Sequence, residues 1–184
     1  MNSSTWPKSI WIGLMITAIA GGTTVAILSQ QIQNPSATQP ILDAPVERTV
    51  EVYWLESRRN RLVAVPRRLK SLSEASTLRQ VLVEMVAKPP QEPNLYSAIP
   101  QNVKILNLAV QGQDIRLDLS REFLGGGGSA TMQGRVIQIL YTATSLNPDA
   151  RLFLSVEGQP LFFLGGEGLE IKQPLTRNNF AVEF

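Results

Sequence analysis

The sequence contains neither cysteine nor histidine, and this excludes several kinds of catalysis and metal binding at once. Without cysteine the chain has no disulfide, no thiol nucleophile and no thiolate metal ligand. Without histidine it lacks the commonest general base near neutral pH and the commonest transition-metal ligand. Ser-His-Asp, Cys-His and zinc-hydrolase chemistry therefore cannot be built within these 184 residues.

Carboxylates offer the remaining route to acid–base chemistry. Asp118, Ser120 and Glu122 alternate along a predicted strand, on the face opposite Leu117 and Leu119. Paired carboxylates can act as acid and base or bind a hard cation such as Ca²⁺. The alternative is the solvated face of a half-buried strand, with Ser120 or Glu122 closing a turn. We favour this alternative, because nothing else in the sequence supplies a second acid–base pair.

Four consecutive glycines, at 125–128, precede a predicted helix. The free N–H groups of a helix N-terminus can bind phosphate. A Walker loop, however, ends in Gly-Lys-Ser/Thr, and here Ser129-Ala130-Thr131 follows without a lysine. We therefore interpret the glycines as a flexible connector. The sequence predicts no catalytic residue, no cofactor-binding residue and no metal ligand.

Six basic residues lie within thirteen positions around a predicted turn: Arg58, Arg59, Arg61, Arg67, Arg68 and Lys70. They could form a site for an anionic lipid or cell-wall polymer, a patch for a partner protein, or a solvated edge whose charge prevents aggregation. We favour the solvated edge and keep the other two as hypotheses. The net charge of +2 is too small to indicate nucleic acid as a partner.

The elements that must position these residues begin at residue 46. Alternating or β-branched apolar residues predict strands at 49–55, 61–65, 106–110, 115–119, 152–156 and 161–164. The second strand continues past Pro66 as an edge segment. Leu106, Leu108 and Val110 are expected to share a buried face. Phe162 and Phe163 are expected to lie buried under the second helix rather than exposed.

Two helices are predicted between these strands. Ser71 as N-cap and Glu74 three residues later form a candidate capping box for the first helix. Its core stripe is Leu78, Val81, Leu82 and Met85, and that of the second helix, from about Ser129 to Leu146, is Met132, Val136, Leu140 and Ala143. The pattern predicts an α+β fold with two helices packed on one face of a mainly antiparallel sheet.

The N-terminal part has the composition of a membrane anchor. Residues 10–28 are uncharged, and as a helix these 19 residues would reach about 28 Å, close to the roughly 30 Å of a bilayer core. Lys8 precedes them and no basic residue follows until Arg48, which places residues 1–9 in the cytoplasm and the rest outside. Residues 29–45 are expected to form a flexible linker. Alternatively, Ala18-Ile19-Ala20 is a cleavage site, and the protein is secreted or periplasmic after processing near Ala20.

Residues 97–123, SAIPQNVKILNLAVQGQDIRLDLSREF, resemble the GerMN domain of sporulation and spore germination proteins. The family pattern has an Ala-Ile-Pro entry, a strand, a glycine-containing turn and an exit of the type Leu-Asp-Leu-Ser-x-Glu-Phe. These positions are held by Ala98 to Pro100, Ile105-Leu106, Gly112 and Leu117 to Phe123. The resemblance implies one GerMN-like domain at 46–184, similar to the small α/β modules that build rings in envelope-spanning secretion machines.

The family has no established catalytic motif, so the resemblance implies a protein that is not an enzyme. The expected function is that of a membrane-anchored bacterial domain outside the cytoplasm, which acts in cell-envelope assembly as a scaffold or interaction module. Its partners would be envelope proteins or further copies of itself. The alternative is a module that binds an anionic envelope polymer or lipid through the basic residues at 58–70, and an envelope hydrolase built on Asp118 and Glu122 is the least favoured hypothesis.

Overall fold

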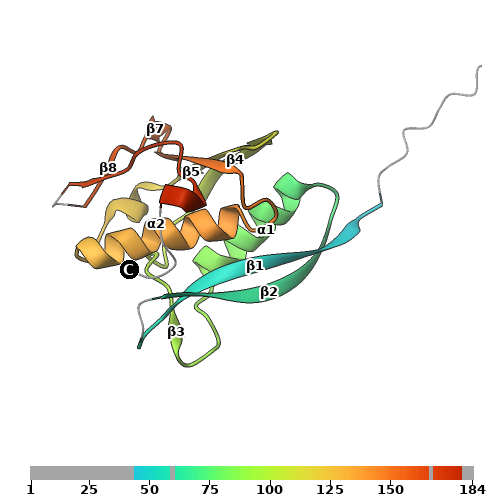
Figure 1. Cartoon of the computed structure of the whole chain (residues 1–184), viewed down its shortest axis with the longest axis horizontal. Helices are drawn as coiled ribbons and strands as arrows, with labels where there is room; N and C mark the ends of the chain where they lie inside the picture. The colour runs from blue at the N-terminus through green and yellow to red at the C-terminus, as the bar shows by residue number, and fades with distance from the viewer. Residues whose placement is uncertain (1–43, 59–60, 166–167, 180–184) are drawn as a thin grey trace, which may run out of the picture. The chain divides into compact units, whose positions relative to one another are not determined.

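The computed structural model describes residues 44–58, 61–165 and 168–179. Its strands and helices are shown in Figure 1. In chain order they are β1 (Val46–Glu56), β2 (Arg61–Ser71), α1 (Glu74–Ala87), β3 (Leu95–Tyr96), β4 (Ile105–Gln111), β5 (Asp114–Leu119), the 3-10 turn η1 (Arg121–Leu124), α2 (Ser129–Ala143), β6 (Arg151–Val156), β7 (Gln159–Pro160), β8 (Phe163–Leu164), β9 (Leu169–Glu170) and the 3-10 turn η2 (Arg177–Asn179).

Several predictions fall outside the described residues. They are the cytoplasmic tail at 1–9, the transmembrane helix at 10–28, the linker at 29–45 except its last two residues, and Arg59. Within the described part of the chain, no helix combines the length and apolar composition needed to cross a membrane.

The strands form three sheets instead of one. The first has the order β2-β1-β3, the second β4-β5-β6-β7, and the third pairs β8 with β9. The parallel pair is β5 with β6, and the other pairs are antiparallel. A mainly antiparallel α+β fold is thus confirmed. The parallel pair arises because α2 carries the chain back across the sheet between β5 and β6, as a crossover helix does.

The β1–β2 hairpin confirms the first two predicted strands and extends both. Each strand has eleven residues, paired from Val46 with Ser71 to Glu56 with Arg61. Pro66 lies on β2, the outer strand of this sheet, and pairs with Glu51 of β1. An outer strand tolerates proline, because the N–H groups on its free side have no neighbouring strand to bond.

Helix α1 begins two residues later than the capping-box prediction, which is therefore wrong. Its N-cap is Ser73, whose hydroxyl accepts from the Ser76 amide at 3.1 Å, and the Ser76 hydroxyl accepts from the Ser73 amide at 3.0 Å. Ser71 is unavailable because β2 continues to it, and its hydroxyl bonds that of Thr77 inside the domain. The predicted stripe of α1 is confirmed: Leu78, Val81, Leu82 and Met85 are all buried.

The β4–β5 hairpin is confirmed, with Gly112 at φ +59° in its two-residue turn. The burial of Leu106 was predicted wrongly. The register shifts between Ile105 and Asn107, so Leu106 is the extra residue of a bulge, and 48% of its surface is exposed. Leu108 on the same strand is buried as expected.

The helices lie between the two larger sheets, which differs from packing on one face of a single sheet (Figure 1). Helix α1 contacts β1 and β2 on one side and β4 on the other. The four stripe residues of α2 are buried, and so is every residue from Gly134 to Ala143. The helix ends at Ala143, three residues before the predicted Leu146, and the Thr144 hydroxyl donates to the Leu140 carbonyl at 2.8 Å.

The residues after β7 are part of the fold. Leu175 pairs with Leu152 of β6, and the Gln173 amide side chain bonds three backbone groups of Leu154 and Leu161 at 2.6–2.8 Å. Arg177 donates to the carbonyls of Tyr141 and Thr144, and its guanidinium lies over the rings of Tyr53 and Tyr141. The C-terminal segment thus connects β6, α2 and β1.

Candidate functional site

The conspicuous polar site of the domain is a junction around Arg135 in the middle of α2. The side chain is 1% exposed, and its Nε donates to the Ala98 carbonyl at 3.1 Å. One terminal nitrogen donates to the Gly126 carbonyl at 2.9 Å and the other to the Phe123 carbonyl. The guanidinium also lies 5.5 Å from the centre of the Phe123 ring. We call this arrangement, Arg135 with the carbonyls of Ala98, Phe123 and Gly126, the Arg135 junction.

The Arg135 junction gathers the sequence motifs that lie far apart in the chain. Ala98 belongs to the Ala-Ile-Pro entry, Phe123 ends the exit motif, and Gly126 lies in the glycine run. Among the described residues, no carboxylate forms an ion pair with Arg135. Burial lowers the pKa of its guanidinium, which still carries its charge at neutral pH. The neutral carbonyls therefore provide the compensation that a buried charge requires.

Gln138, one turn further along α2, binds the same entry motif. Its side-chain oxygen accepts from the Ala98 amide at 3.1 Å, and its amide nitrogen donates to the Ser97 hydroxyl at 3.2 Å. The side chain has no exposed surface. Neither Gln138 nor Arg135 was among the predicted site residues. A signal was available, because Arg135 is the single charged residue between Ser129 and Leu146, in an otherwise uncharged helix.

The carboxylates of the exit motif do not converge on a common point. Asp118 accepts from the Ser155 hydroxyl at 2.6 Å and the Gly158 amide at 2.9 Å, so it supports the turn between β6 and β7. Glu122 lies in η1, where a hydrogen bond from the Ser120 hydroxyl lowers the pKa of its carboxyl group. Ser120 itself is buried and accepts from the Lys104 amide at 2.9 Å. These contacts correspond to the turn-closing role weighed for Ser120 and Glu122.

The glycine run has a defined backbone between η1 and α2. Gly126 and Gly127 have φ values of +70° and +87°, in the left-handed region that favours glycine. A Cβ atom at Gly127 would come within 2.7 Å of the Thr131 side chain. The N-cap of α2 is Gly128, without a side-chain cap bond. The run therefore delivers the Gly126 carbonyl to Arg135 and starts the helix.

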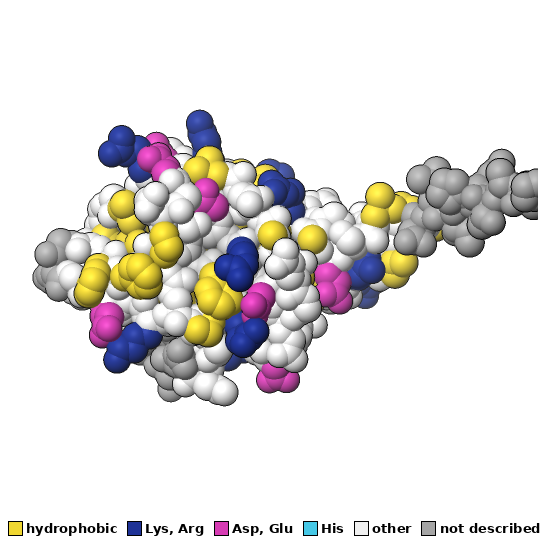
Figure 2. All heavy atoms as spheres, turned by 90° about the horizontal axis from the view of Figure 1, so that it is seen from above, with side chains coloured by type: hydrophobic (Ala, Val, Ile, Leu, Met, Phe, Trp, Pro, Cys, Tyr) yellow, Lys and Arg dark blue, Asp and Glu magenta, His cyan; other side chains and the backbone are white. Residues whose placement is uncertain are grey.

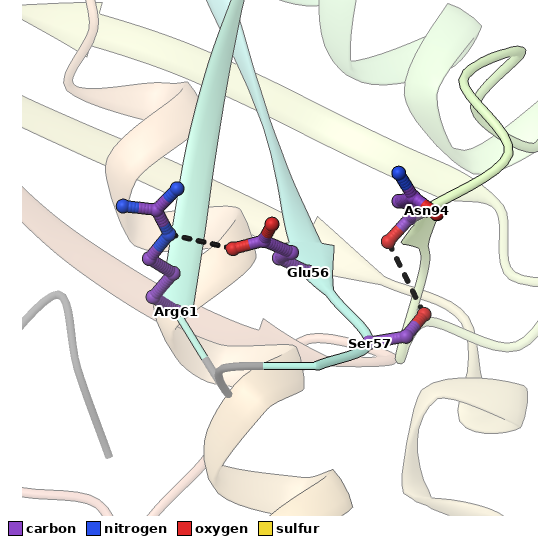
Figure 3. A network of polar contacts seen from close by, with 4 residues as sticks. All are labelled: Glu56, Ser57, Arg61 and Asn94. Carbon is purple, nitrogen blue, oxygen red and sulfur yellow. Dashed lines mark hydrogen bonds and ion pairs between the residues drawn. The ribbon is translucent and has the colours of Figure 1, made fainter.

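The predicted basic residues are distributed over different parts of the first hairpin. Arg58 is exposed in the turn, and Arg61 pairs with Glu56 at 2.6 Å (Figure 3). The turn is tied to the segment before β3, since the Ser57 hydroxyl donates to the Asn94 carbonyl at 3.2 Å (Figure 3). Side chains alternate along β2, so Arg68 and Lys70 lie exposed on one face while the half-buried Arg67 lies on the other. A ligand-binding role of these residues stays a prediction.

Phe162 and Phe163 are exposed, so the expectation that they are buried under the second helix is wrong. Their exposed fractions are 56% and 65%, whereas Leu161 and Leu164 on either side are buried. The two leucines take the inward positions, and the two rings between them lie at the surface. Figure 2 views the domain from the side of β7 and β8, where hydrophobic side chains gather on the surface. We call Phe162 and Phe163 the aromatic pair.

The described residues contain no group of three or more acidic side chains that could hold a metal ion. Polar groups of the entry and exit motifs form hydrogen bonds within the domain. The exposed apolar side chains of the domain, above all the aromatic pair, remain at its surface.

A family model described as "Germane: Sporulation and spore germination" matches residues 51–162. No curated protein matches the chain. Among solved structures, the chain is similar to the tandem GerMN domains of the sporulation protein GerM from Bacillus subtilis, at 21% identity and a TM-score of 0.61 over 73% of this chain. It spans about half the length of that structure, 48%.

The first GerMN domain of the same protein is matched at 20% identity and a TM-score of 0.57, over 71% of this chain and 98% of that domain. At these identities the structures establish a common fold. The family match extends from β1 to the start of the aromatic pair and contains both motifs that meet at the Arg135 junction. The chain belongs to the sporulation and spore germination family, whose domain is called Germane or GerMN.

Proposed function

We propose that this chain is a non-catalytic interaction module of the bacterial cell envelope. In this proposal residues 10–28 anchor the protein in the cytoplasmic membrane, and the domain from residue 46 onward lies outside the cytoplasm. A further protein of the envelope docks on the domain through exposed apolar surface that includes the aromatic pair. The chain acts by holding that partner in place.

One observation carries the proposal: the polar groups of the two family motifs are engaged in holding the fold. Ser97, Ser120 and Asp118 all have partners inside the domain, as do the carbonyls of Ala98 and Phe123. A catalytic site needs polar groups that are free to meet a substrate. Exposed aromatic residues, in contrast, are enriched where proteins bind one another.

The test is co-purification of the tagged full-length protein from membranes. Replacing Phe162 and Phe163 with serine should remove the partner and leave the melting temperature unchanged, because both rings are exposed. The matched control replaces Val46 and Leu72, which are 54% and 62% exposed, with serine and should keep the partner. Retention of the partner by the Phe162→Ser, Phe163→Ser variant would contradict the proposal.

A second candidate function, binding of an anionic lipid or polymer, is favoured by the ion-pair pattern of the first hairpin. Of its basic residues that the structure describes, Arg61 pairs with a carboxylate, while Arg58, Arg67, Arg68 and Lys70 form no ion pair. Replacing Arg58, Arg68 and Lys70 with glutamine should then abolish sedimentation with phosphatidylglycerol vesicles. The same charge loss at the exposed Arg79, Lys88 and Arg121 should leave it intact, and equal loss in both variants would indicate attraction by net charge alone.

A further inference from the structure

Strand β4 is an edge strand that lacks charge and proline as protection against pairing with another chain. It is the outer strand of the four-stranded sheet, and no described segment pairs with its free side. Its seven residues, ILNLAVQ, contain no charge and no proline. The outer strand β2 of the first sheet carries Pro66 and four basic residues instead, and β7 has two residues and ends in Pro160. Proline, charge, short length and β-bulges are devices that natural edge strands use to block pairing, and on β4 the bulge at Leu106 lies near the start of the strand and leaves residues 107–111 regular.

The register of the β4–β5 hairpin shows which backbone groups face the free edge. The two-residue turn is closed by the pair Gln111 and Asp114. In an antiparallel ladder hydrogen-bonded and non-bonded pairs alternate, so Gln111, Ala109 and Asn107 bond to β5. Leu108 and Val110 therefore direct their N–H and C=O groups away from β5, toward the free edge.

We propose that β4 pairs with β4 of a second copy of this chain, antiparallel and across a two-fold axis at Ala109. In this register Leu108 faces Val110 of the second copy, and the two residues exchange both of their backbone hydrogen bonds. The two-fold repeats this exchange, which gives four bonds in all. This inference goes beyond the docking of an envelope partner proposed above, uses a different surface, and can fail or succeed independently of it.

The absence of charge on β4 is the reason for choosing a second copy as the occupant. A two-fold interface brings each residue close to its own equivalents, and like charges directly opposite each other destabilise a strand pair. On the solvent face, β4 would place Ala109 opposite Ala109 and Asn107 opposite Gln111, so small and neutral amide side chains meet. Arg116 of the neighbouring strand is held away, with its guanidinium 4.9 Å from the centre of the Phe153 ring on β6. Strand β2 could not pair in this way, because its own cations would oppose one another.

The bulge at Leu106 limits this interface to residues 107–111 on each copy. A five-residue strand pair is small compared with stable protein interfaces. We therefore expect association that depends on concentration and on confinement of both copies to the same membrane.

The absence of natural cysteine allows a direct test by oxidative cross-linking of single-cysteine variants of the full-length protein in membranes. In the proposed register the Cβ atoms at position 109 lie about 4.5–5.5 Å apart, which is close enough for a disulfide to form with small adjustments. Ala109→Cys should give a dimer on a non-reducing gel. Two positions 107, in contrast, lie about 14 Å apart, because each is two residues from the axis.

Asn107→Cys and Gln111→Cys should therefore fail to cross-link separately and should cross-link when the two variants are expressed together. Adding Ala109→Lys to this mixed pair should abolish the product by placing like charges at the two-fold. Gln159→Cys, exposed on β7 at the opposite edge, is the control and should remain monomeric. No dimer with Ala109→Cys, an equal yield with Gln159→Cys, or a product of a different protein would each overturn the proposal.

Discussion

At the scale of single residues, Arg135 is a side chain that joins four separate segments of the domain. It joins the segment before β4, the turn η1 and the glycine run to α2 through three carbonyl groups. A buried arginine without a carboxylate partner is unusual, because burial penalises its charge. Here the planar guanidinium meets three acceptors that a lysine ammonium could not reach in the same geometry.

Replacing Arg135 with methionine should lower the free energy of unfolding by about 3 kcal/mol or more, because each buried carbonyl left without a donor costs about 1–3 kcal/mol. Arg135→Lys should restore only part of this loss. The control is Arg79→Met on the exposed face of α1, for which a change within about 0.5 kcal/mol is expected. Denaturant unfolding of the purified protein measures both, and equal stability of the Arg135→Met and Arg79→Met variants would refute the role of the junction.

The pKa of Glu122 provides a second test at this scale. The hydrogen bond from Ser120 lowers the pKa of the Glu122 carboxyl group in the folded protein below its ordinary value. A lowered folded-state pKa contributes stability above the unfolded-state pKa, and this contribution is lost as the pH falls through the folded-state pKa. Ser120→Ala should raise the pKa of Glu122 in an NMR titration, and Ser120→Thr, which keeps the hydroxyl group, should raise it less. An unchanged pKa in Ser120→Ala would show that Ser120 is not the cause.

At the scale of elements, the sequence predicts the type and the buried face of both helices correctly. The stripes of α1 and α2 are buried as expected, because apolar spacing of three and four residues determines which side of a helix meets the core. The start of α1 was predicted two residues too early, because Ser71 had to be assigned either to the strand or to the helix cap. Long-range pairing with Val46 assigns it to the strand. Pairing of this kind cannot be read from a local motif.

Two further predictions, the burial of Leu106 and the burial of the aromatic pair, were wrong for the same reason, because both depend on tertiary structure. The bulge at Leu106 depends on how β4 aligns with β5, and alternation along one strand does not contain that information. The exposure of Phe162 and Phe163 depends on the short β8–β9 hairpin, whose two-residue strands are too brief to give a periodic signal. The sequence signals Arg135 by its isolated charge on the second helix, but the acceptors of the Arg135 junction are backbone carbonyls, which have no sequence signature.

The helix assignment can be tested on adjacent residues of α1. Leu82 has no exposed surface and Val83 is 44% exposed. Leu82→Ala should lower the free energy of unfolding by about 2–5 kcal/mol through the cavity it creates. Val83→Ala should change it by less than about 0.5 kcal/mol. Similar melting curves of the two variants would mean that Leu82 does not lie on the buried face of α1.

At the scale of the whole molecule, the domain extends beyond the residues that the family model matches. That match ends at residue 162, yet the segment from Ile171 to Arg177 bonds β6, α2 and the loop at Leu161. The Gln173 side chain accepts a hydrogen bond from the Leu154 N–H and donates one to the Leu154 C=O. A fragment cut at the family boundary would leave these backbone groups without partners and is expected to be less stable.

Gln173→Ala should therefore cost about 1–3 kcal/mol, because it leaves backbone groups of Leu154 and Leu161 without their partners. The neighbouring Lys172 is exposed, and its 3.7 Å contact with Glu170 lies between two exposed side chains. Lys172→Ala should change stability by less than about 1 kcal/mol. Thermal unfolding of both variants distinguishes an integral C-terminal segment from a peripheral one, for which the two costs would be equal.

The membrane topology proposed for the chain is testable at the same scale. The uncharged residues 10–28 behind Lys8 predict that the domain lies outside the cytoplasm. A periplasmic-type reporter fused after Phe184 should be active, a cytoplasmic-type reporter should be inactive, and the protein should remain in membranes after a high-salt wash. A soluble mature form that begins at Gly21 would contradict the anchor and support cleavage after Ala20.

The central claim, that the domain acts by binding a protein partner through the aromatic pair, is tested most directly by site-specific photo-cross-linking in living cells. A photoreactive residue replaces Phe163 in the full-length protein, and the matched control carries it at Gln80, which is exposed on α1. The proposal predicts a discrete protein adduct from position 163 and none from position 80. Irradiation that yields no adduct at position 163, or the same adducts from both positions, would contradict it.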